Sequence, residues 1–242
     1  VGTVESLPLI TSSILSKKIA SGLKSLILDV KVGNGSFNST IEISRELSQS
    51  LVSVAKGAGL KCEAIITDMN QVLGKSAGHT LEMLECIKYL KNEIKDYRLE
   101  KITNELISSL LMMVHKISKE DALKKIEEVL SNGAAAEKFE KMTSALGGPK
   151  NILSTYETDL HNESTVRDIF SDKEGWIEKI HTRELGLILI ELGGGRKQVS
   201  DKINYGVGYD SVISVGEKID STKPLLQLYS NTEDDSKELE ER

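Results

Sequence analysis

The first seventy residues alternate between apolar and polar stretches in a pattern that predicts a helix, a strand, a second helix and a second strand. Pro8 follows Ser6 closely. Proline is tolerated in the first turn of a helix, where its missing N–H would have no partner, so a helix is expected over about residues 8–20, ending near Gly22. The next apolar run is compact and predicts a buried strand over residues 24–32.

A second helix is predicted from a capping-box signature, Ser39 with Glu42 three residues later, followed by apolar positions at helical spacing as far as Gly57. Residues 62–67 then predict a second short strand. Strand, helix, strand indicates two parallel strands with a right-handed crossover. Because active sites of such sheets lie beyond the carboxyl ends of the strands, residues 33–37 and 68–78 are the loops of interest.

In the rest of the chain, the sequence pattern changes from helical to short, glycine-rich segments at residues 147–149, Gly-Gly-Pro. Residues 79–146 read as helical, with a looser capping signature at Ser118 and Asp121 and a stop or turn at Gly133. Later segments are short and rich in glycine, and a final strand is predicted over residues 225–229. The fold class is therefore α/β, with a mostly parallel sheet covered by helices and a smaller carboxyl-terminal mixed α/β domain from about residue 160.

Charge and composition narrow the class of partner. The net charge of the 242 residues is −6, but residues 232–242 hold six acidic and two basic residues, so the body is close to neutral. A body without a basic stripe gives no electrostatic reason to bind nucleic acid or an anionic membrane, which favours a small-molecule partner. The acidic run at residues 233–241 is expected to begin a solvated helix.

The cysteines and the apolar runs indicate a cytoplasmic protein. Cys62 and Cys86 match neither a metal motif nor a disulfide framework, so reduced thiols are expected. The longest apolar runs are too short to cross a bilayer, and no signal peptide opens the chain.

Candidate chemistry starts with Ser13 and Lys17, which lie four residues apart on the first predicted helix. At this spacing they share one face and can reach the same ligand. A hydroxyl and an ammonium suit a planar heterocycle with ring carbonyls, since lysine can donate to a carbonyl oxygen that gains negative charge. The same spacing is common on solvated helix faces, so by itself it leaves that alternative open.

Several blocks of the sequence together resemble one family, thymidine phosphorylase and related pyrimidine nucleoside phosphorylases. The first block contains Ser13 and Lys17, and the others follow it in the family's order over nearly the whole chain. The blocks are SLPLITSSILSKK (residues 6–18), DVKVGNGSF (29–37), TDMNQVLG (67–74), TRELG (182–186) and LGGGR (192–196).

The resemblance implies a reaction, phosphorolysis of thymidine or deoxyuridine to the free base and 2-deoxyribose 1-phosphate. Phosphate is then the co-substrate, and no organic cofactor is expected. The positions matching Ser13 and Lys17 contact the pyrimidine, and Lys17 stabilises the leaving base. The family's base-contacting arginine and its phosphate loop fall before Val1, so the chain is expected to lack its amino-terminal part and to be inactive alone.

The resemblance also implies a division of the chain. Residues 1–20 are expected to be the remnant of a helical lobe that binds the base and forms homodimers. Residues 21–159 would belong to the central α/β domain. Residues 160–242 would form a carboxyl-terminal domain, either whole or cut short.

A potassium ion is a further implication of the resemblance. The matching ligands are the backbone carbonyls of Leu73 and Ser76 and the carboxylate of Glu85, and oxygen ligands suit a hard cation. Glu85 alternatively is a surface glutamate of a helix. Gly33-Asn34-Gly35 could be taken for a phosphate cradle, but it lacks the third glycine of such motifs and is interpreted as a tight turn.

Three other functions remain open at this level. They are an anthranilate phosphoribosyltransferase-like transferase, a binding module without catalysis, and a dinucleotide-binding oxidoreductase, which the missing glycines argue against. The histidines are interpreted as structural. His181 and Asn204 stand where the family is expected to carry aspartate.

Overall fold

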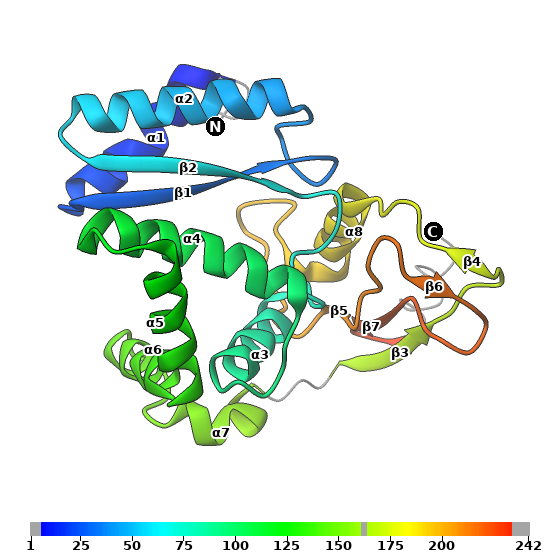
Figure 1. Cartoon of the computed structure of the whole chain (residues 1–242). Coiled ribbons are helices and arrows are strands. Elements are labelled where there is room, and N and C mark those ends of the chain that lie inside the picture. Colours follow the sequence, from blue (N-terminus) through cyan, green and yellow to red (C-terminus); the bar gives the residue numbers. More distant parts are fainter. Residues whose placement is uncertain (1–5, 161–163, 234–242) are drawn as a thin grey trace. The chain divides into compact units, whose positions relative to one another are not determined.

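In the computed structural model of the chain, residues 6–160 and 164–233 are described (Figure 1). His161 and all of the acidic run except Glu233 lie outside these residues. The chain forms two compact units, one within Val1–Asn70 and Leu99–Glu127 and the other within Gln71–Arg98 and Glu128–Arg242.

The first unit is built on a pair of parallel strands. Strand β1 (Ser25–Val32) pairs with β2 (Lys61–Asp68) from Ser25 opposite Lys61 to Val32 opposite Asp68. Helix α1 (Leu7–Ala20) precedes them and α2 (Ile41–Gly57) connects them, and both helices lie on the same side of the pair in Figure 1. The predicted strand, helix, strand arrangement with parallel pairing is confirmed, with both strands within one residue of their expected bounds.

The two helices and two strands enclose one apolar core. Leu15 of α1 and Leu51 of α2 are each 1% exposed, so both helices are fixed against the strands by side chains that are almost fully removed from water. The buried members of this core are Leu15, Leu26, Val30, Leu47, Leu51, Ala55, Leu60 and Cys62. Thr11 and Ser50 add a hydrogen bond between the helices, with 2.9 Å between their hydroxyl oxygens.

Helix α2 is capped by Thr40, and not by Ser39 as the capping-box signature predicted. The Thr40 Oγ1 accepts a hydrogen bond from the Ile43 N–H at 3.4 Å, and α2 begins at Ile41. Serine and threonine are both good N-caps, so two such residues in succession leave the start ambiguous by one position. The prediction of Ser39 is wrong for this reason.

We expect Thr40→Ala to lower the free energy of unfolding by about 0.5–1 kcal/mol, because it removes the acceptor of an otherwise unpaired helical N–H. Urea unfolding followed by circular dichroism measures the change. Ser39→Ala is the matched control and should change the free energy by less than about 0.5 kcal/mol, as surface substitutions outside such contacts do. A larger loss for Ser39→Ala than for Thr40→Ala would restore the original prediction.

Helices α4 (Tyr97–His115) and α5 (Lys119–Ser131) follow later in the chain. Ser118 precedes α5, and its hydroxyl makes two hydrogen bonds with Asp121. The Asp121 N–H donates to Ser118 Oγ at 3.1 Å, and Ser118 Oγ donates to the Asp121 carboxylate at 2.7 Å. This capping signature is confirmed.

The second unit contains a helical cluster and two small antiparallel sheets. Helices α3 (His79–Leu90), α6 (Ala134–Ala145) and α7 (Ile152–Asp159) surround a core centred on Ile87, Ile152 and Tyr156. Strands β3 (Thr165–Ile169), β7 (Leu226–Ser230) and β5 (Gly208–Asp210) form one sheet in that order. Strands β4 (Gly175–Trp176) and β6 (Lys218–Ile219) pair separately.

A helical segment packs on the three-stranded sheet. Helix α8 (Thr182–Leu189) continues into a π-type turn, η1 (Ile190–Gly194), whose Leu192 is buried with Val207, Tyr209, Val212 and Leu228. The mixed α/β character expected of the carboxyl-terminal part is therefore found. Among the residues that the structure describes, no helix combines the length and apolarity needed to cross a membrane.

Candidate base site and cation loop

The predicted base-binding pair lies on α1, on the side that does not enter the core. Ser13 and Lys17 are both exposed, whereas Thr11 and Leu15 of the same helix are buried. Lys17 belongs to the last turn of α1, and its carbonyl oxygen accepts a hydrogen bond from the Ser21 hydroxyl at 2.8 Å. An ammonium and a hydroxyl one helical turn apart can both donate to the carbonyl groups of a planar ring.

The N–H groups at the start of the turn after β1 are used for hydrogen bonds within the protein. Asn70 closes it, because the side-chain Oδ1 accepts from both the backbone and the side-chain amide of Asn34. All four successive N–H groups have protein acceptors: Gly33 on Asn38 O, Asn34 on Asn70 Oδ1, Gly35 on Met69 O and Ser36 on Gly33 O. These contacts agree with a tight turn, and the absence of a phosphate cradle stays a prediction.

Glycine is required at position 33 of this turn. Gly33 has φ +127, and a Cβ added there would lie 2.7 Å from Asn70 Oδ1. The conformation is rare for residues with a side chain, and the space is already occupied. The structure thus gives a physical reason for the first glycine of the block DVKVGNGSF.

Glu85 of α3 lies against the loop that carries Leu73 and Ser76. Its Oε1 accepts a hydrogen bond from the Lys75 N–H at 2.7 Å, and a Cβ on Gly74 would overlap its carboxylate. The structure therefore brings the predicted glutamate to the middle of the predicted loop. Glu85 is only partly exposed.

The surroundings of Glu85 disfavour its negatively charged form. Burial is the largest influence and raises the pKa of its carboxyl group, while N–H groups of Lys75 and Ser76 oppose the shift and the charges of Asp96 and Asp210 add to it. A surplus of negative charge in a partly buried place is relieved by a positive ion. A carboxylate and main-chain carbonyl oxygens are ligand types that suit a hard cation such as potassium. The main-chain groups that contact the Glu85 carboxylate in the structure are the N–H groups of Lys75 and Ser76.

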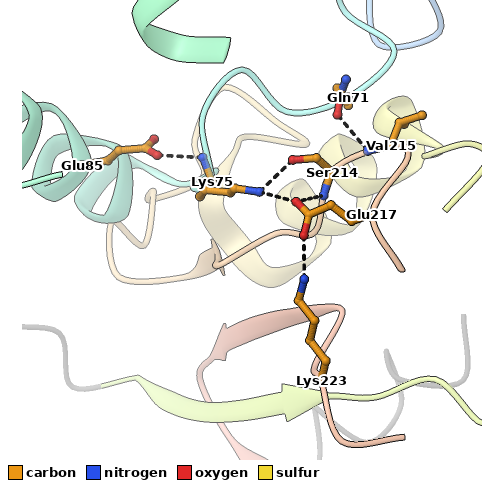
Figure 2. A network of polar contacts seen from close by, with 7 residues as sticks. All are labelled: Gln71, Lys75, Glu85, Ser214, Val215, Glu217 and Lys223. Carbon is orange, nitrogen blue, oxygen red and sulfur yellow. Dashed lines mark hydrogen bonds and ion pairs between the residues drawn. The ribbon is translucent and has the colours of Figure 1, made fainter. Parts of the chain in front are cut away.

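Lys75 of the same loop joins a polar network with Glu217. Lys75 Nζ lies 2.9 Å from Glu217 Oε1, and Lys223 Nζ lies 2.6 Å from Glu217 Oε2 (Figure 2). The hydrogen bond from Lys223 is the largest cause that lowers the pKa of Glu217, to about 2. The contacts with Lys75 and the Ser214 N–H act in the same direction, and burial acts against them.

Two cavities in the described part of the second unit are lined by residues other than the predicted site residues. A cavity of about 300 Å³ is lined mainly by apolar side chains of α8 and the three-stranded sheet. A larger one, about 890 Å³, is lined by His79, Thr80, Met83, Asp159, Leu160, Ser164, Ile203, Asn204, Tyr205, Gly206 and Asn231. His79 Nε2 there lies 3.2 Å from the Gly194 carbonyl oxygen, and the ring meets Tyr205 edge-on, which agrees with a structural role.

The two departures from the family pattern have visible local consequences. His181 is the residue before α8 and makes no side-chain capping hydrogen bond, whereas an aspartate there could accept from the first helical N–H groups. Asn204 accepts from the Gly206 N–H at 2.8 Å and donates to Asn231 Oδ1 at 2.5 Å. An aspartate could make only the first of these bonds.

Sequence reasoning missed Lys75, Glu217 and Asn70. Asn70 lies inside one of the family blocks, but the block does not indicate that its side chain holds the turn after β1. Lys75 and Glu217 carried no signal, because charged residues at unrelated positions have no spacing that links them.

Comparison with known families accounts for both parts of the chain. Residues 1–136 match the profile of the glycosyl transferase family, a/b domain, and residues 176–242 match the pyrimidine nucleoside phosphorylase C-terminal domain. Thymidine phosphorylase of Colwellia psychrerythraea is 44% identical over 233 residues, which are 96% of this chain and 53% of that protein. The chain thus spans about half the length of this curated relative.

The resemblance that the sequence blocks predicted is confirmed by these matches. The first profile covers more than half of the chain, and the second covers the glycine-rich part that follows. The chain belongs to the glycosyl transferase family defined by this a/b domain, and its carboxyl-terminal part matches the C-terminal domain of the pyrimidine nucleoside phosphorylases.

Proposed function

We propose that the chain supplies the base-binding half of an enzyme for phosphorolysis of thymidine or deoxyuridine, a pentosyltransferase reaction of nucleoside salvage and catabolism. The observation that carries this proposal is the 44% identity to a thymidine phosphorylase over 96% of the chain. The match to the pyrimidine nucleoside phosphorylase C-terminal domain supports the same substrate class. No organic cofactor is part of the proposal.

In the proposed reaction a phosphate oxygen attacks the anomeric carbon of the sugar while the bond to the pyrimidine nitrogen breaks. The electron pair of that bond moves onto the ring and its carbonyl oxygens. Lys17 donates a hydrogen bond to the carbonyl oxygen that gains charge, and Ser13 orients the ring. The exposure of both side chains on α1 supports this role, because a ligand can reach them.

We further propose that Leu73 and Ser76, through their carbonyl groups, and Glu85, through its carboxylate, hold a potassium ion. The placement of Glu85 against Gly74 and Lys75 supports this set, as does the excess of negative charge from Asp96 and Asp210. Such an ion would supply positive charge and order to the loop. It would take no part in bond making.

The homodimer, the cytoplasmic location and the division at residues 20 and 159 belong to the same proposal. The match of residues 176–242 to a separate domain profile supports the carboxyl-terminal division. Sedimentation of the purified protein would measure the dimer.

The test compares the chain of 242 residues with a chimera that also carries the part of the Colwellia thymidine phosphorylase outside the matched region. We expect the chimera to release thymine from thymidine only when phosphate is present, and the chain alone to release none. Reacting groups must be held together for turnover, and the residues assigned here hold only the base. Release of thymine by the chain alone would overturn the division of labour. A chimera that folds but instead transfers the phosphoribosyl group of phosphoribosyl pyrophosphate to anthranilate, with release of pyrophosphate, would overturn the proposed reaction.

A further inference from the structure

Residues 71–77, here called the cation loop, are joined to residues 209–217, here called the brace segment. Both belong to the second unit. Their main chains exchange three hydrogen bonds: Ala77 N–H to Tyr209 O at 2.9 Å, Tyr209 N–H to Ala77 O at 2.7 Å, and Val212 N–H to Lys75 O at 3.0 Å. The loop is therefore paired along its second half like a short strand.

Side chains join the same two segments at both ends of the loop. Gln71 Oε1 accepts from the Val215 N–H at 3.0 Å, and Ser76 Oγ donates to Asp210 Oδ1 at 2.9 Å. Figure 2 shows Gln71 and Lys75 pointing toward the brace segment from the same stretch of chain. The two positions proposed as cation ligands, Leu73 and Ser76, thus lie in a loop whose ends are both attached to the brace segment.

Lys75 connects Glu85 to the brace segment, because its N–H, its carbonyl oxygen and its ammonium group have different partners. Its N–H donates to Glu85 Oε1, and its carbonyl oxygen accepts from Val212. Its ammonium donates to Ser214 Oγ at 2.7 Å and to Glu217 Oε1 at 2.9 Å. One residue therefore links the carboxylate of the proposed cation site to the brace segment.

The Glu217 carboxylate is held in place by other hydrogen bonds besides the one from Lys75. Its Oε1 also accepts from the Ser214 N–H at 3.2 Å, and its Oε2 accepts from Lys223 at 2.6 Å. Its side chain and that of Lys75 are about one-third exposed, at 34% and 36%. An isolated pair of this exposure contributes little to stability, but a carboxylate with three donors in fixed places also fixes the orientation of what it binds.

We propose that Glu217 is a positioning residue for the potassium site: through Lys75 it holds the cation loop in the conformation in which Leu73, Ser76 and Glu85 can bind the ion. This inference rests on the proposed function, which supplies the cation site. It adds that the carboxyl-terminal domain controls the affinity of that site. If the loop binds the ion only when it is ordered, its apparent affinity for the ion is the intrinsic affinity multiplied by the fraction of time the loop is ordered.

The test replaces Glu217 with glutamine, which keeps the shape of the side chain and removes its charge. Hydrogen exchange of the amides in residues 71–77 is measured in the chain of 242 residues and in the chimera described above. The melting temperature of both is titrated with potassium chloride against choline chloride at constant ionic strength. We expect amide exchange in the cation loop to be about tenfold faster in Glu217→Gln and half-saturation to need about five- to tenfold more potassium.

Two observations separate positioning from a general loss of stability. In choline chloride the melting temperature of Glu217→Gln should stay close to that of the parent chain, and saturating potassium should restore slow exchange in the loop. Lys75→Met should reproduce the shift in potassium dependence, and the double variant should add little to either single change.

Glu93→Gln is the matched control. It removes a carboxylate that forms an ion pair with Lys91 at 2.6 Å, outside the cation loop and the brace segment. It should leave loop exchange and the potassium titration unchanged. An equal effect of Glu93→Gln, or no effect of Glu217→Gln on the titration, would overturn the proposal.

The outcomes also distinguish this inference from the function on which it rests. A parent protein that does not respond to potassium in either form overturns the cation site, and the role of Glu217 with it. A potassium response that Glu217→Gln shifts, in a chimera that releases no thymine, supports the positioning role and overturns the proposed phosphorolysis.

Discussion

Replacing Lys17 with alanine should lower kcat/KM for phosphate-dependent release of thymine by about 30- to 1,000-fold, corresponding to about 2–4 kcal/mol of lost transition-state stabilisation. The physical reason is that the leaving pyrimidine becomes negatively charged at its carbonyl oxygens only as the bond to the sugar breaks. A positioned ammonium therefore stabilises the transition state more than it stabilises the bound nucleoside. The loss should appear mainly in kcat.

The measurement uses the chimera, with thymine release followed by absorbance and with saturating phosphate. Lys18→Ala is the matched control, since Lys18 is the next residue of α1, is also exposed, and faces a different direction from Lys17 on a helix. It should change kcat/KM by less than a factor of two or three. Near-normal turnover by Lys17→Ala would rule out the role assigned to this lysine, and an effect confined to KM would assign it to ground-state binding.

Replacing Gly208 with alanine should lower the free energy of unfolding of the second unit by about 3 kcal/mol or more. Gly208 is the first residue of β5 and has φ +156, a conformation that residues with a side chain rarely adopt. An added Cβ would lie 3.0 Å from Gly78 Cα and closer still to the Ala77 carbonyl oxygen. Backbone atoms cannot move aside as a flexible side chain can, so the bridge between Ala77 and Tyr209 should open.

Glycine 175 offers a matched control on another strand. A Cβ at Gly175 of β4 would meet no atom within 4 Å, and its backbone lies outside the left-handed region. Gly175→Ala should leave the stability within about 0.5 kcal/mol of the parent. Thermal unfolding and hydrogen exchange of residues 71–77 measure both variants. Equal free energies of unfolding for the two variants would contradict this prediction. They would show that the backbone at Ala77 can move to accommodate the added Cβ without loss of stability.

The parallel pair could be predicted from the sequence because its signal is local. The apolar run around Leu26 and Val30 is bounded by glycine on both sides, and the helix that follows has apolar residues at regular spacing. The start of that helix was placed one residue early, since Ser39 and Thr40 are both suitable caps. Strands β4 and β6 have two residues each, which is too short for any period to appear.

The candidate site was predictable only in the part that family blocks cover. Ser13, Lys17 and Glu85 came from that resemblance, and spacing alone would have left them among many exposed polar residues. The brace segment could not be found, because its bonds to the cation loop join residues that are 134 to 144 positions apart. Hydrogen bonds between residues so far apart in the sequence produce no local sequence pattern from which they could be predicted.

That separation has a consequence for how the protein is made. During synthesis the cation loop leaves the ribosome long before the brace segment exists, and closing so long a stretch of chain is entropically costly until partners are present. The Ala77 N–H and the carbonyl oxygens of Lys75 and Ala77 must meanwhile be hydrated or bound elsewhere. The cation loop should therefore be among the last parts to acquire its native hydrogen bonds, and a nascent chain halted near residue 200 should fold its first parallel strands without it.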